Sequence, residues 1–200
     1  MVDRLVNCWQ AFWCMYILSA SFISNFEIIR HHHQYDVLKQ LVINAIASLG
    51  VAMFAERYLS ITTIEHKFGW YQVVVSLLIM EIWFYYSHRI AHSKYIFPRI
   101  HRMHHFFTQP YAFTGVYCSV GEMLFINIPS MMIGPIITGM SYNLMTTWIV
   151  IIAINTAISH SDVIIPYINS GTHGIHHQKH NKNFGILGIL DRIHGTYESM

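Results

Sequence analysis

Long apolar segments are the feature of this 200-residue sequence that most restricts its fold. A helix needs about 20 mostly apolar residues to cross the hydrocarbon layer of a membrane. A helix also pairs its backbone polar groups internally, as lipid requires. Five segments approach that length: Leu5–Ile23, Val37–Ala55, Trp70–Tyr86, Val116–Met140 and Tyr142–Ser159. The sequence therefore predicts an all-α integral membrane bundle of about four to five spans.

Composition excludes several other classes of protein. Hydrophobic residues make up 54% of the chain and charged residues only 11%, which is too apolar for an ordinary soluble domain. The formal net charge is +2 and the basic residues are dispersed, so we expect no nucleic-acid partner. Cys8, Cys14 and Cys118 lack CxxC spacing, which argues against a zinc knuckle or a disulfide framework. Without a repeat or a linker, residues 1–200 are interpreted as a single domain.

The first and fourth apolar segments are the least regular. Leu5–Ile23 contains no charge, is long for the core of a signal peptide and lacks a basic lead-in. We therefore interpret it as a retained span. The fourth segment contains Pro129, Gly134 and Pro135, so we expect it to be kinked or irregular where neighbouring helices protect it.

The positions of polar residues predict the orientation of the bundle. His88 and His92 end the third span and His160 ends the fifth, so the two intervening crossings bring them to one membrane face. Lys and Arg follow the same two spans, which marks this face as cytosolic. The histidines are then expected in a cytosolic helical cap, with the amino terminus in the lumen and the carboxyl terminus in the cytosol.

Nine of the 15 histidines have the spacing of metal ligands. The stretch "HRIAH" has i,i+4 spacing, and "HRMHH" and "HGIHH" have i,i+3,i+4 spacing, which places each set on one helical face. Pro98 suits the first turn of a short helix that carries the second set. With the isolated His160, the candidate ligands are His88, His92, His101, His104, His105, His160, His173, His176 and His177. Two octahedral metals offer roughly twelve ligand positions, so a two-metal site accounts for nine.

The other histidines are assigned different roles. His66 and His194 stand alone, and a lone imidazole in a membrane protein is more often an interfacial residue than a ligand. His31, His32 and His33 are consecutive, which spreads their rings around a helix, so we expect a solvated loop. Two triplets of identical spacing, together with a pair on the same face, argue against such a structural role for the nine.

Glu81 lies within the third span on the same helical stripe as Tyr85, His88 and His92. An ionisable group inside a span is costly, so we interpret Glu81 as functional. Its carboxylate is expected to accept the second N–H of a ligand histidine, which would fix the tautomer of that ring. The alternative is a structural role, in which Glu81 pairs with another polar group of the bundle.

From Glu81 to Tyr197, the sequence resembles the fatty acid hydroxylase and sterol desaturase superfamily of membrane di-iron enzymes. "EIWFYYSHRIAH" is similar to the family pattern of an acidic residue, Tyr-Trp and HRxxH, with Glu81 for the usual Asp and Tyr86 for the usual Trp. "HRMHH" with "TQPYAF", then "AISHSD", then "HGIHHQKHNKNFGILGILDRIHGTY" are similar to the remaining motifs. In the last of these, Phe184 replaces a tyrosine and Leu190 a common tryptophan.

The resemblance also covers residues beyond the nine histidines. His180 is additional to the family pattern and lies seven residues after His173, so it is expected to be a ligand or a supporting donor. Asp191 belongs to the Asp-x-x-x-Gly-Thr motif and, with Tyr85, is expected to support the ligands. Glu122, in "VYCSVGEMLF", matches a glutamate of the sterol C-4 methyl oxidases and has no assigned role.

The resemblance implies a centre of two iron ions that uses O2 to oxidise an unactivated C–H bond of a lipid. A b-type cytochrome or similar carrier, with its reductase, is expected to deliver electrons in the endoplasmic reticulum membrane. Sterol oxidation is the first expectation and fatty-acyl or sphingolipid hydroxylation the second. Hydroxylation and desaturation both stay open because they depend on sub-ångström placement of the substrate. A zinc-binding protein without activity and a decayed enzyme are the non-enzymatic alternatives; no oligomeric state is implied.

Overall fold

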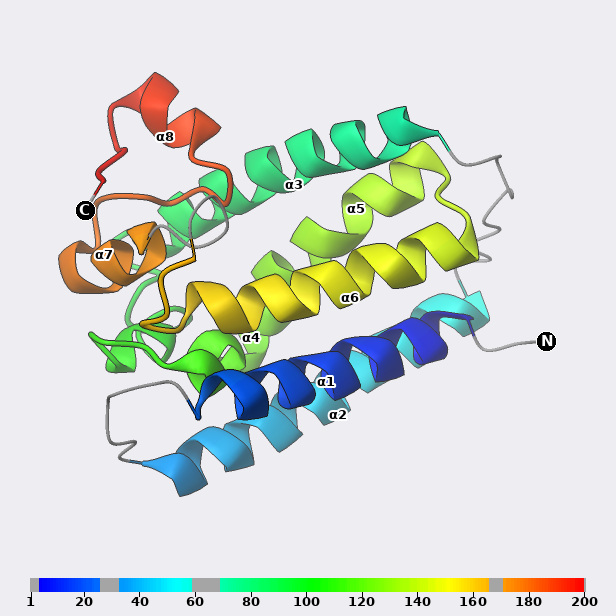
Figure 1. Ribbon diagram of the computed structural model, residues 1–200, viewed down its shortest axis with the longest axis horizontal. Coiled ribbons are helices and arrows are strands. Elements are labelled where there is room, and N and C mark those ends of the chain that lie inside the picture. Colours follow the sequence, from blue (N-terminus) through cyan, green and yellow to red (C-terminus); the bar gives the residue numbers. More distant parts are fainter. Residues whose placement is uncertain (1–3, 26–32, 59–68, 166–170, 200) are drawn as a thin grey trace.

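Helices that run along one common axis form the body of the protein (Figure 1). The computed structural model describes residues 4–25, 33–58, 69–165 and 171–199, and within these ranges it contains no strand. The long helices are α1 (Arg4–Ile23), α2 (Gln34–Tyr58), α3 (Trp70–Ala91) and α6 (Tyr142–Ser159). A further helical run joins α4 (Val120–Glu122), η3 (Met123–Asn127) and α5 (Ile128–Thr138). The predicted all-α fold is confirmed.

Four of these helical runs are long and apolar enough to cross a membrane, within the part of the chain that the structure describes. They are α2, α3, α6 and the combined run Val120–Thr138. At most 33% of the most apolar stretch of any of them is buried inside the protein. The rest faces outward, as expected for helices surrounded by lipid.

The predicted first span forms helix α1, although α1 is not among the four most apolar runs. It packs against α2 and α6 and buries one aromatic face. On that face, the Nε1 atoms of Trp9 and Trp13 donate to Ser48 Oγ at 3.0 and 3.1 Å. The hydroxyl of Tyr16 donates to the carbonyl of Ala112 at 2.8 Å, which joins α1 to the segment after the second histidine cluster. Each of these polar groups is thus paired within the apolar bundle.

The irregularity predicted for the fourth segment is a π-helical turn, η3, which precedes Pro129. A proline in a helix donates no backbone hydrogen bond, so the turn before it is free to take the wider π geometry. Gly134 serves a different purpose, because a Cβ there would lie 2.7 Å from Cα of Ser76. The glycine therefore allows α5 to lie directly against α3.

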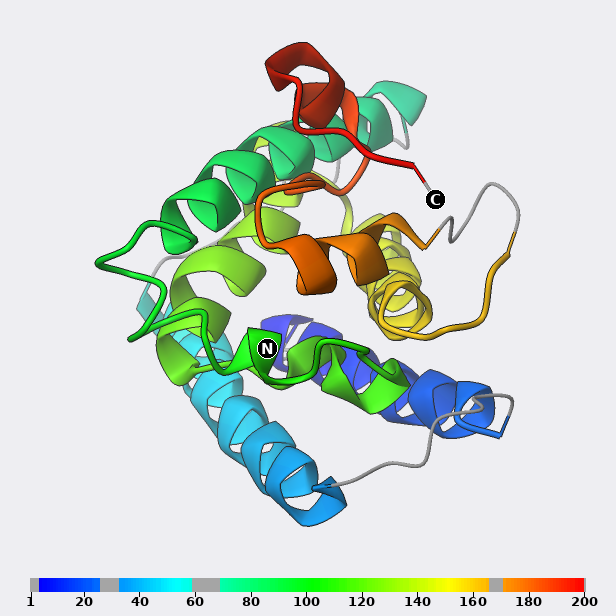
Figure 2. The ribbon, with the colours of Figure 1, turned by 90° about the vertical axis from the view of Figure 1, so that its left-hand side faces the viewer.

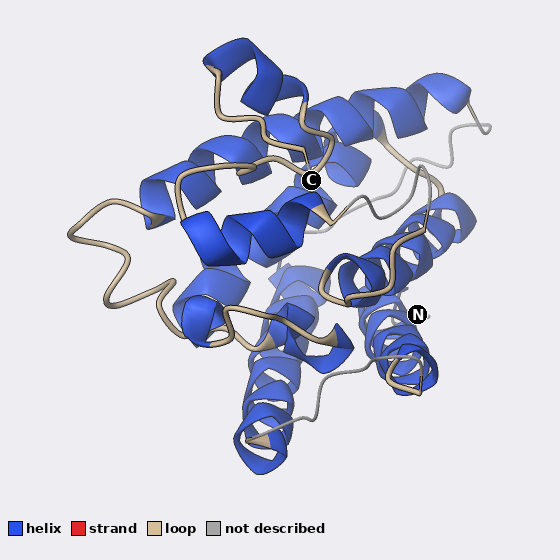
Figure 3. Ribbon diagram, turned by 60° about the vertical axis from the view of Figure 1, so that its left-hand side comes forward, coloured by secondary structure: helices blue, strands red, loops and turns tan. Residues whose placement is uncertain are grey.

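Short helices and loops form a cap at one end of the bundle (Figures 1 and 2). The cap contains η1 (His104–Phe106), η2 (Ala112–Val116), α7 (Thr172–Lys179) and α8 (Ile189–His194). Two packed pairs, α3 with α5 and α1 with α6, lead to it. The described chain starts at the opposite end and finishes in the cap (Figure 1), and it consists of helices and loops (Figure 3). The two ends therefore lie on opposite sides of the bundle, as the span count predicts.

Candidate metal centre

Four separate parts of the chain bring the nine candidate histidines into the cap. Helix α3 carries His88 on its last turn and ends at His92, whose N–H donates to the carbonyl of His88 at 3.1 Å. His160 occupies the same capping position at the end of α6, and α7 carries the third cluster. The second cluster was expected on a helix starting near Pro98; instead, hydrogen-bonded turns lead into the short 3₁₀ helix η1.

These histidines form two groups in the described part of the chain. One group contains His88, His92, His101, His105 and His176, and the other contains His104, His160, His173 and His177. Within each group, one nitrogen from every ring lies within 4.8 Å of all the others. The predicted constellation is therefore brought together completely, and it divides into five and four.

The rings meet through their Nε2 atoms. In the first group, Nε2 of His101 lies 3.0 Å from Nε2 of both His88 and His105, and Nε2 of His176 lies 3.1 Å from those of His92 and His105. In the second group, Nε2 of His160 lies 3.3 and 2.8 Å from the Nε2 atoms of His104 and His173. Metal bonds of about 2.1 Å at right angles separate two nitrogens by about 3.0 Å, against about 3.4 Å for tetrahedral angles. The first group therefore has the spacing of an octahedral metal site.

Backbone carbonyls fix the other nitrogen of four rings. Nδ1 of His88 donates to the carbonyl of Phe184 at 2.8 Å, and Nδ1 of His176 donates to that of Lys182 at 2.6 Å. His177 and His160 donate in the same way to the carbonyls of Phe107 and Thr156, at 3.0 and 2.9 Å. A neutral imidazole with its proton on Nδ1 presents a lone pair at Nε2. These rings are thus held in the tautomer that a metal requires.

Lone pairs that face one another at 3.0 Å repel, and a cation between them removes the repulsion. Nδ1 of His88 and Nδ1 of His176 both donate to backbone carbonyls, so the Nε2 atoms of both rings are acceptors. These two rings belong to one group whose nitrogens lie within 4.8 Å of one another, and neither ring has a proton to offer the other. The residues present therefore fit a pair of metal ions.

Burial keeps the rings neutral at physiological pH. Desolvation, with a smaller contribution from neighbouring histidines, lowers the pKa of His92 to about 2 and that of His105 to about 3. Burial also lowers the pKa of His160 to about 4, against an opposing hydrogen bond to Thr156. Since only the neutral ring coordinates a metal, these shifts favour ligation.

The carboxylate nearest to a candidate ligand is that of Glu122. Its 2.9 Å approach to His101 is within hydrogen-bonding distance, both residues are buried, and the angle departs from that of a good hydrogen bond. A carboxylate beside the second nitrogen raises the basicity of a histidine ligand. The sequence indicated Glu122 only through a motif similarity, without a role.

The role predicted for Glu81 is wrong, because its carboxylate accepts backbone N–H groups and not a histidine. Oε2 accepts from Ile186 and Leu187 at 2.8 and 2.7 Å, and Oε1 accepts from Leu190 at 3.0 Å. Seven residues of helix rise by about 10 Å, which separates Glu81 from the ring of His88. Glu81 instead holds the loop after Phe184, whose carbonyl orients His88.

Asp191 and Tyr85 support the same loop. Like Glu81, they form no hydrogen bond with a ligand histidine in the described structure. Asp191 accepts from the N–H groups of Phe184 and Gly185 at 2.8 and 2.7 Å, and from the hydroxyl of Thr196 at 2.7 Å. The hydroxyl of Tyr85 lies 3.3 Å from that of Thr196 and accepts from Arg89. These contacts support the ligands through the backbone and not by direct contact.

The remaining histidines lie outside both groups in the described structure. The ring of His180 packs against that of His105 with centroids 4.4 Å apart, without joining the group. His33 is exposed beside Asp36, and Nδ1 of His194 donates to the carbonyl of Leu190. The predictions for His31, His32 and His66 concern positions outside the described residues.

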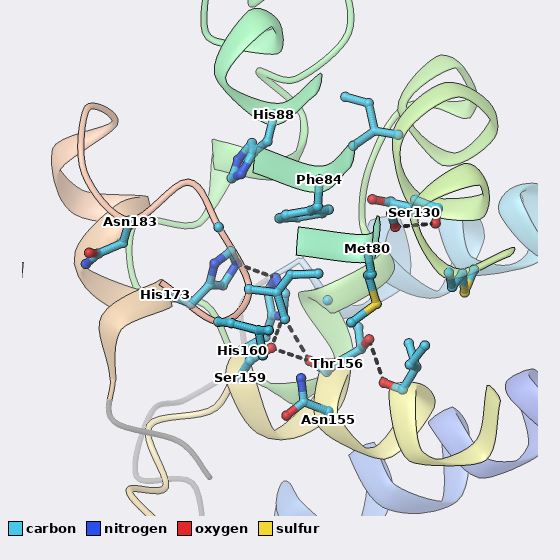
Figure 4. A pocket seen from close by; sticks show the side chains of 18 of the residues that line it. Met80, Phe84, His88, Ser130, Asn155, Thr156, Ser159, His160, His173 and Asn183 are labelled. Carbon is cyan, nitrogen blue, oxygen red and sulfur yellow. Dashed lines mark hydrogen bonds between the residues drawn. The ribbon is translucent and has the colours of Figure 1, made fainter. Parts of the chain in front are cut away.

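A cavity of about 610 Å³ begins at the histidines and extends between α3, α5 and α6 (Figure 4). Residues of both groups line its upper end, including His88, His101, His104, His160 and His173. Farther down, its lining includes Phe84, Met80, Ile151, Met131 and Trp148. The volume lies within the range of small-molecule sites, and the lining suits an apolar ligand.

The family model named Fatty acid hydroxylase matches residues 73–196, more than half of the chain. The chain belongs to the fatty acid hydroxylase family. The match includes the nine histidines and the helices between them. No solved structure matches the chain.

Three curated relatives show the range of names within the family. The chain is 35% identical over 132 residues to the Homo sapiens fatty acid hydroxylase domain-containing protein 2, covering 64% of this chain and 40% of the relative. It is 28% identical over 138 residues to the Arabidopsis thaliana methylsterol monooxygenase 2-2, covering 62% and 52%. It is 29% identical over 140 residues to an Oryza sativa subsp. japonica very-long-chain aldehyde decarbonylase, GL1-9, covering 64% and 54%. The chain thus spans about half or less of the length of these relatives.

Proposed function

We propose that this membrane protein is an O2-dependent di-iron oxygenase that hydroxylates or desaturates an unactivated C–H position of a lipid. One observation carries the proposal: two groups of converging histidine Nε2 atoms lie at the upper end of a single apolar cavity. Family membership supports it further. Two irons held by the nine histidines, five on one and four on the other, would supply reductive activation of O2 and oxidation of the C–H bond.

The atoms and electrons of both outcomes balance with one external donor. In hydroxylation, two electrons and two protons reduce O2, one oxygen atom enters the product and the other leaves as water. In desaturation, the substrate loses two hydrogens and both oxygen atoms leave as water. The two electrons come from a b-type cytochrome, or a similar carrier, with its reductase.

The residues of the chain have three tasks in this chemistry. The carbonyls of Phe184, Lys182, Phe107 and Thr156 fix the Nδ1–H tautomer of four rings, which leaves their Nε2 atoms available to a metal. The cavity wall around Phe84 and Met80 holds an apolar substrate against the histidines and excludes water. Glu122 holds His101, and the loop bound by Glu81 holds His88 through Phe184.

A sterol is our first proposed substrate, and a fatty-acyl or sphingolipid chain is the alternative. A methylsterol monooxygenase and a fatty acid hydroxylase are both among the relatives. Arg89, Lys94, Arg99 and Arg102 near the histidine end of the bundle support a cytosolic cap, which is where an electron carrier would bind. We also propose the endoplasmic reticulum membrane, which follows from the resemblance to the superfamily and not from the charges.

Metal analysis combined with lipid profiling tests the proposal against a zinc-binding or decayed protein. About two irons per purified chain, with a lipid oxidised by wild type and not by His104→Ala, are expected from the ligand count. His33→Ala is the matched control, because His33 is exposed and outside both groups. Zinc alone, with identical lipid profiles for wild type and His104→Ala, would overturn the proposal.

A further inference from the structure

One cavity-lining side chain of α6, that of Asn155, differs from the hydroxyls of the same helix. The hydroxyls of Thr146, Thr147 and Thr156 each donate to the carbonyl four residues earlier, at 2.9, 3.0 and 2.9 Å, and that of Ser159 donates to the carbonyl three residues earlier at 3.2 Å. The carboxamide of Asn155 has no hydrogen bond to any described residue, although Asn155 lines the cavity (Figure 4). Its donors and acceptor therefore face the cavity unsatisfied.

Asn127 presents a second carboxamide to the same cavity from the run Val120–Thr138. Its Nδ2 lies 3.5 Å from Sγ of Cys118, which is a weak acceptor, and its Oδ1 has no partner among the described residues. Two amides from different helices thus lie in one apolar cavity with most of their hydrogen-bonding capacity unused.

The two amides lie at a similar depth below the histidines. Asn155 precedes His160 by five residues, and Asn127 follows Glu122, the neighbour of His101, by five. Five residues of helix correspond to about 7 Å. Beyond this level the cavity is lined mainly by Met80, Ile151, Met131 and Trp148, and the indole N–H of Trp148 is already bound to the carbonyl of Met131.

Both amides are only partly buried, so solvent is able to reach them. A lipid that fills the cavity displaces that solvent, which is costly unless the lipid itself offers the amides a hydrogen-bonding atom. We propose that Asn155 and Asn127 determine substrate specificity by binding an oxygen atom of the lipid, a hydroxyl or a carbonyl. Because they lie about one and a half turns below the histidines, this oxygen is close to the oxidised carbon and not at the far end of the lipid. The substrate class is therefore an oxygenated lipid, and this inference rests on the proposed function.

Equilibrium binding to the purified holoprotein tests this inference without turnover. The probes are cholesterol and its 3-deoxy analogue, and, for an open chain, octadecanol and octadecane. In each pair only the alcohol is able to use the amides. We expect wild type to bind at least one alcohol about 3 to 10-fold more tightly than its deoxy partner, the usual worth of one hydrogen bond.

Asn155→Leu should remove the preference by weakening only the alcohol. Asn143→Leu is the matched control, since Asn143 lies on the exposed face of α6 near the opposite end of the helix. Iron content and melting temperature in detergent show whether each variant is folded. Asn127→Leu provides a second test from the facing helix.

Two results would overturn the inference: no alcohol preference in wild type with either pair, or a preference that survives in Asn155→Leu. If the two amides bind only water and no lipid oxygen, this second result is expected. The proposed function has a separate outcome, because a protein that oxidises lipids without alcohol preference refutes only the role of the amides. A protein that prefers the alcohol but oxidises nothing refutes only the oxygenase.

Discussion

Replacing Glu81 by Gln should loosen the metal site from a distance. The carboxylate of Glu81 is buried and accepts three backbone N–H groups, from Ile186, Leu187 and Leu190. The single oxygen of Gln has room for two of these donors, and its NH₂ group then faces the third. The substitution therefore replaces charge-assisted bonds by neutral ones and leaves one buried donor without a partner, at a cost of about 3 kcal/mol.

The loop held by Glu81 directly follows Phe184, whose carbonyl fixes Nδ1 of His88. Loss of such a supporting contact lowers metal affinity by about 10 to 100-fold. We therefore expect Glu81→Gln to melt several degrees below wild type in detergent and to release metal at lower concentrations of a chelator. Melting curves and competition titration of the metal measure the two effects independently.

Glu56 offers a matched control at the other end of the bundle. Its carboxylate also accepts three backbone N–H groups, from Arg4, Leu5 and Val6 at 2.7, 3.0 and 3.3 Å. Glu56→Gln should lower the melting temperature without changing metal affinity. The reasoning is refuted if both variants lose metal equally, or if Glu81→Gln loses stability and binds metal like wild type.

Four further predictions follow from the same contacts. Glu122→Gln replaces the carboxyl group beside Nδ1 of His101 by an amide, so metal affinity should fall about 10-fold by titration with little change in melting temperature. His180→Ala should retain wild-type metal content, because that ring lies outside both groups. Chelation should raise amide hydrogen exchange in residues 92–107 and 171–187 and leave the spans unchanged, since the metals join cap segments; unchanged exchange in the cap would contradict this. In sealed vesicles, a tag after Ser199 should be cleaved by protease from the cytosolic side, and protection of that tag would refute the orientation.

Helical spacing and the count of spans predicted most of the histidine site. Spacing of three and four residues places ligands on one face of a helix, and this holds for His173, His176 and His177 on α7. The second cluster converges without a regular helix. Its turns mix i to i−4 hydrogen bonds, from His101 to Phe97 and from His105 to His101, with an i to i−3 bond from His104 to His101. His88 and His160 lie at the same end of the bundle because two spans separate them. Both spans are visible in the sequence as apolar segments.

The partners of Glu81 and Glu122 could not be predicted from residue spacing within one helix. Glu81 shares a helical stripe with His88, but its partners are N–H groups more than a hundred residues later in the chain. Glu122 contacts His101 because its helical run passes beside the second cluster, and nothing in its own neighbourhood in the sequence indicates that partner. Long-range contacts of single polar groups depend on the packed fold, which periodicity does not describe.

The backbone around Asn183 links the loop after α7 to the orientation of two histidine rings. Asn183 has φ of 53°, a left-handed conformation that is costly for most residues and tolerated by Asn. Its side chain is held by hydrogen bonds to the carbonyls of Thr172 and Glu198 and from the N–H of Glu198, at 3.0, 2.9 and 2.8 Å. The carbonyls on either side of it, those of Lys182 and Phe184, orient His176 and His88. The left-handed conformation of Asn183 therefore points the two neighbouring carbonyls at two different rings. Asn183 is not a metal ligand, yet it determines where the Nε2 atoms of His88 and His176 point.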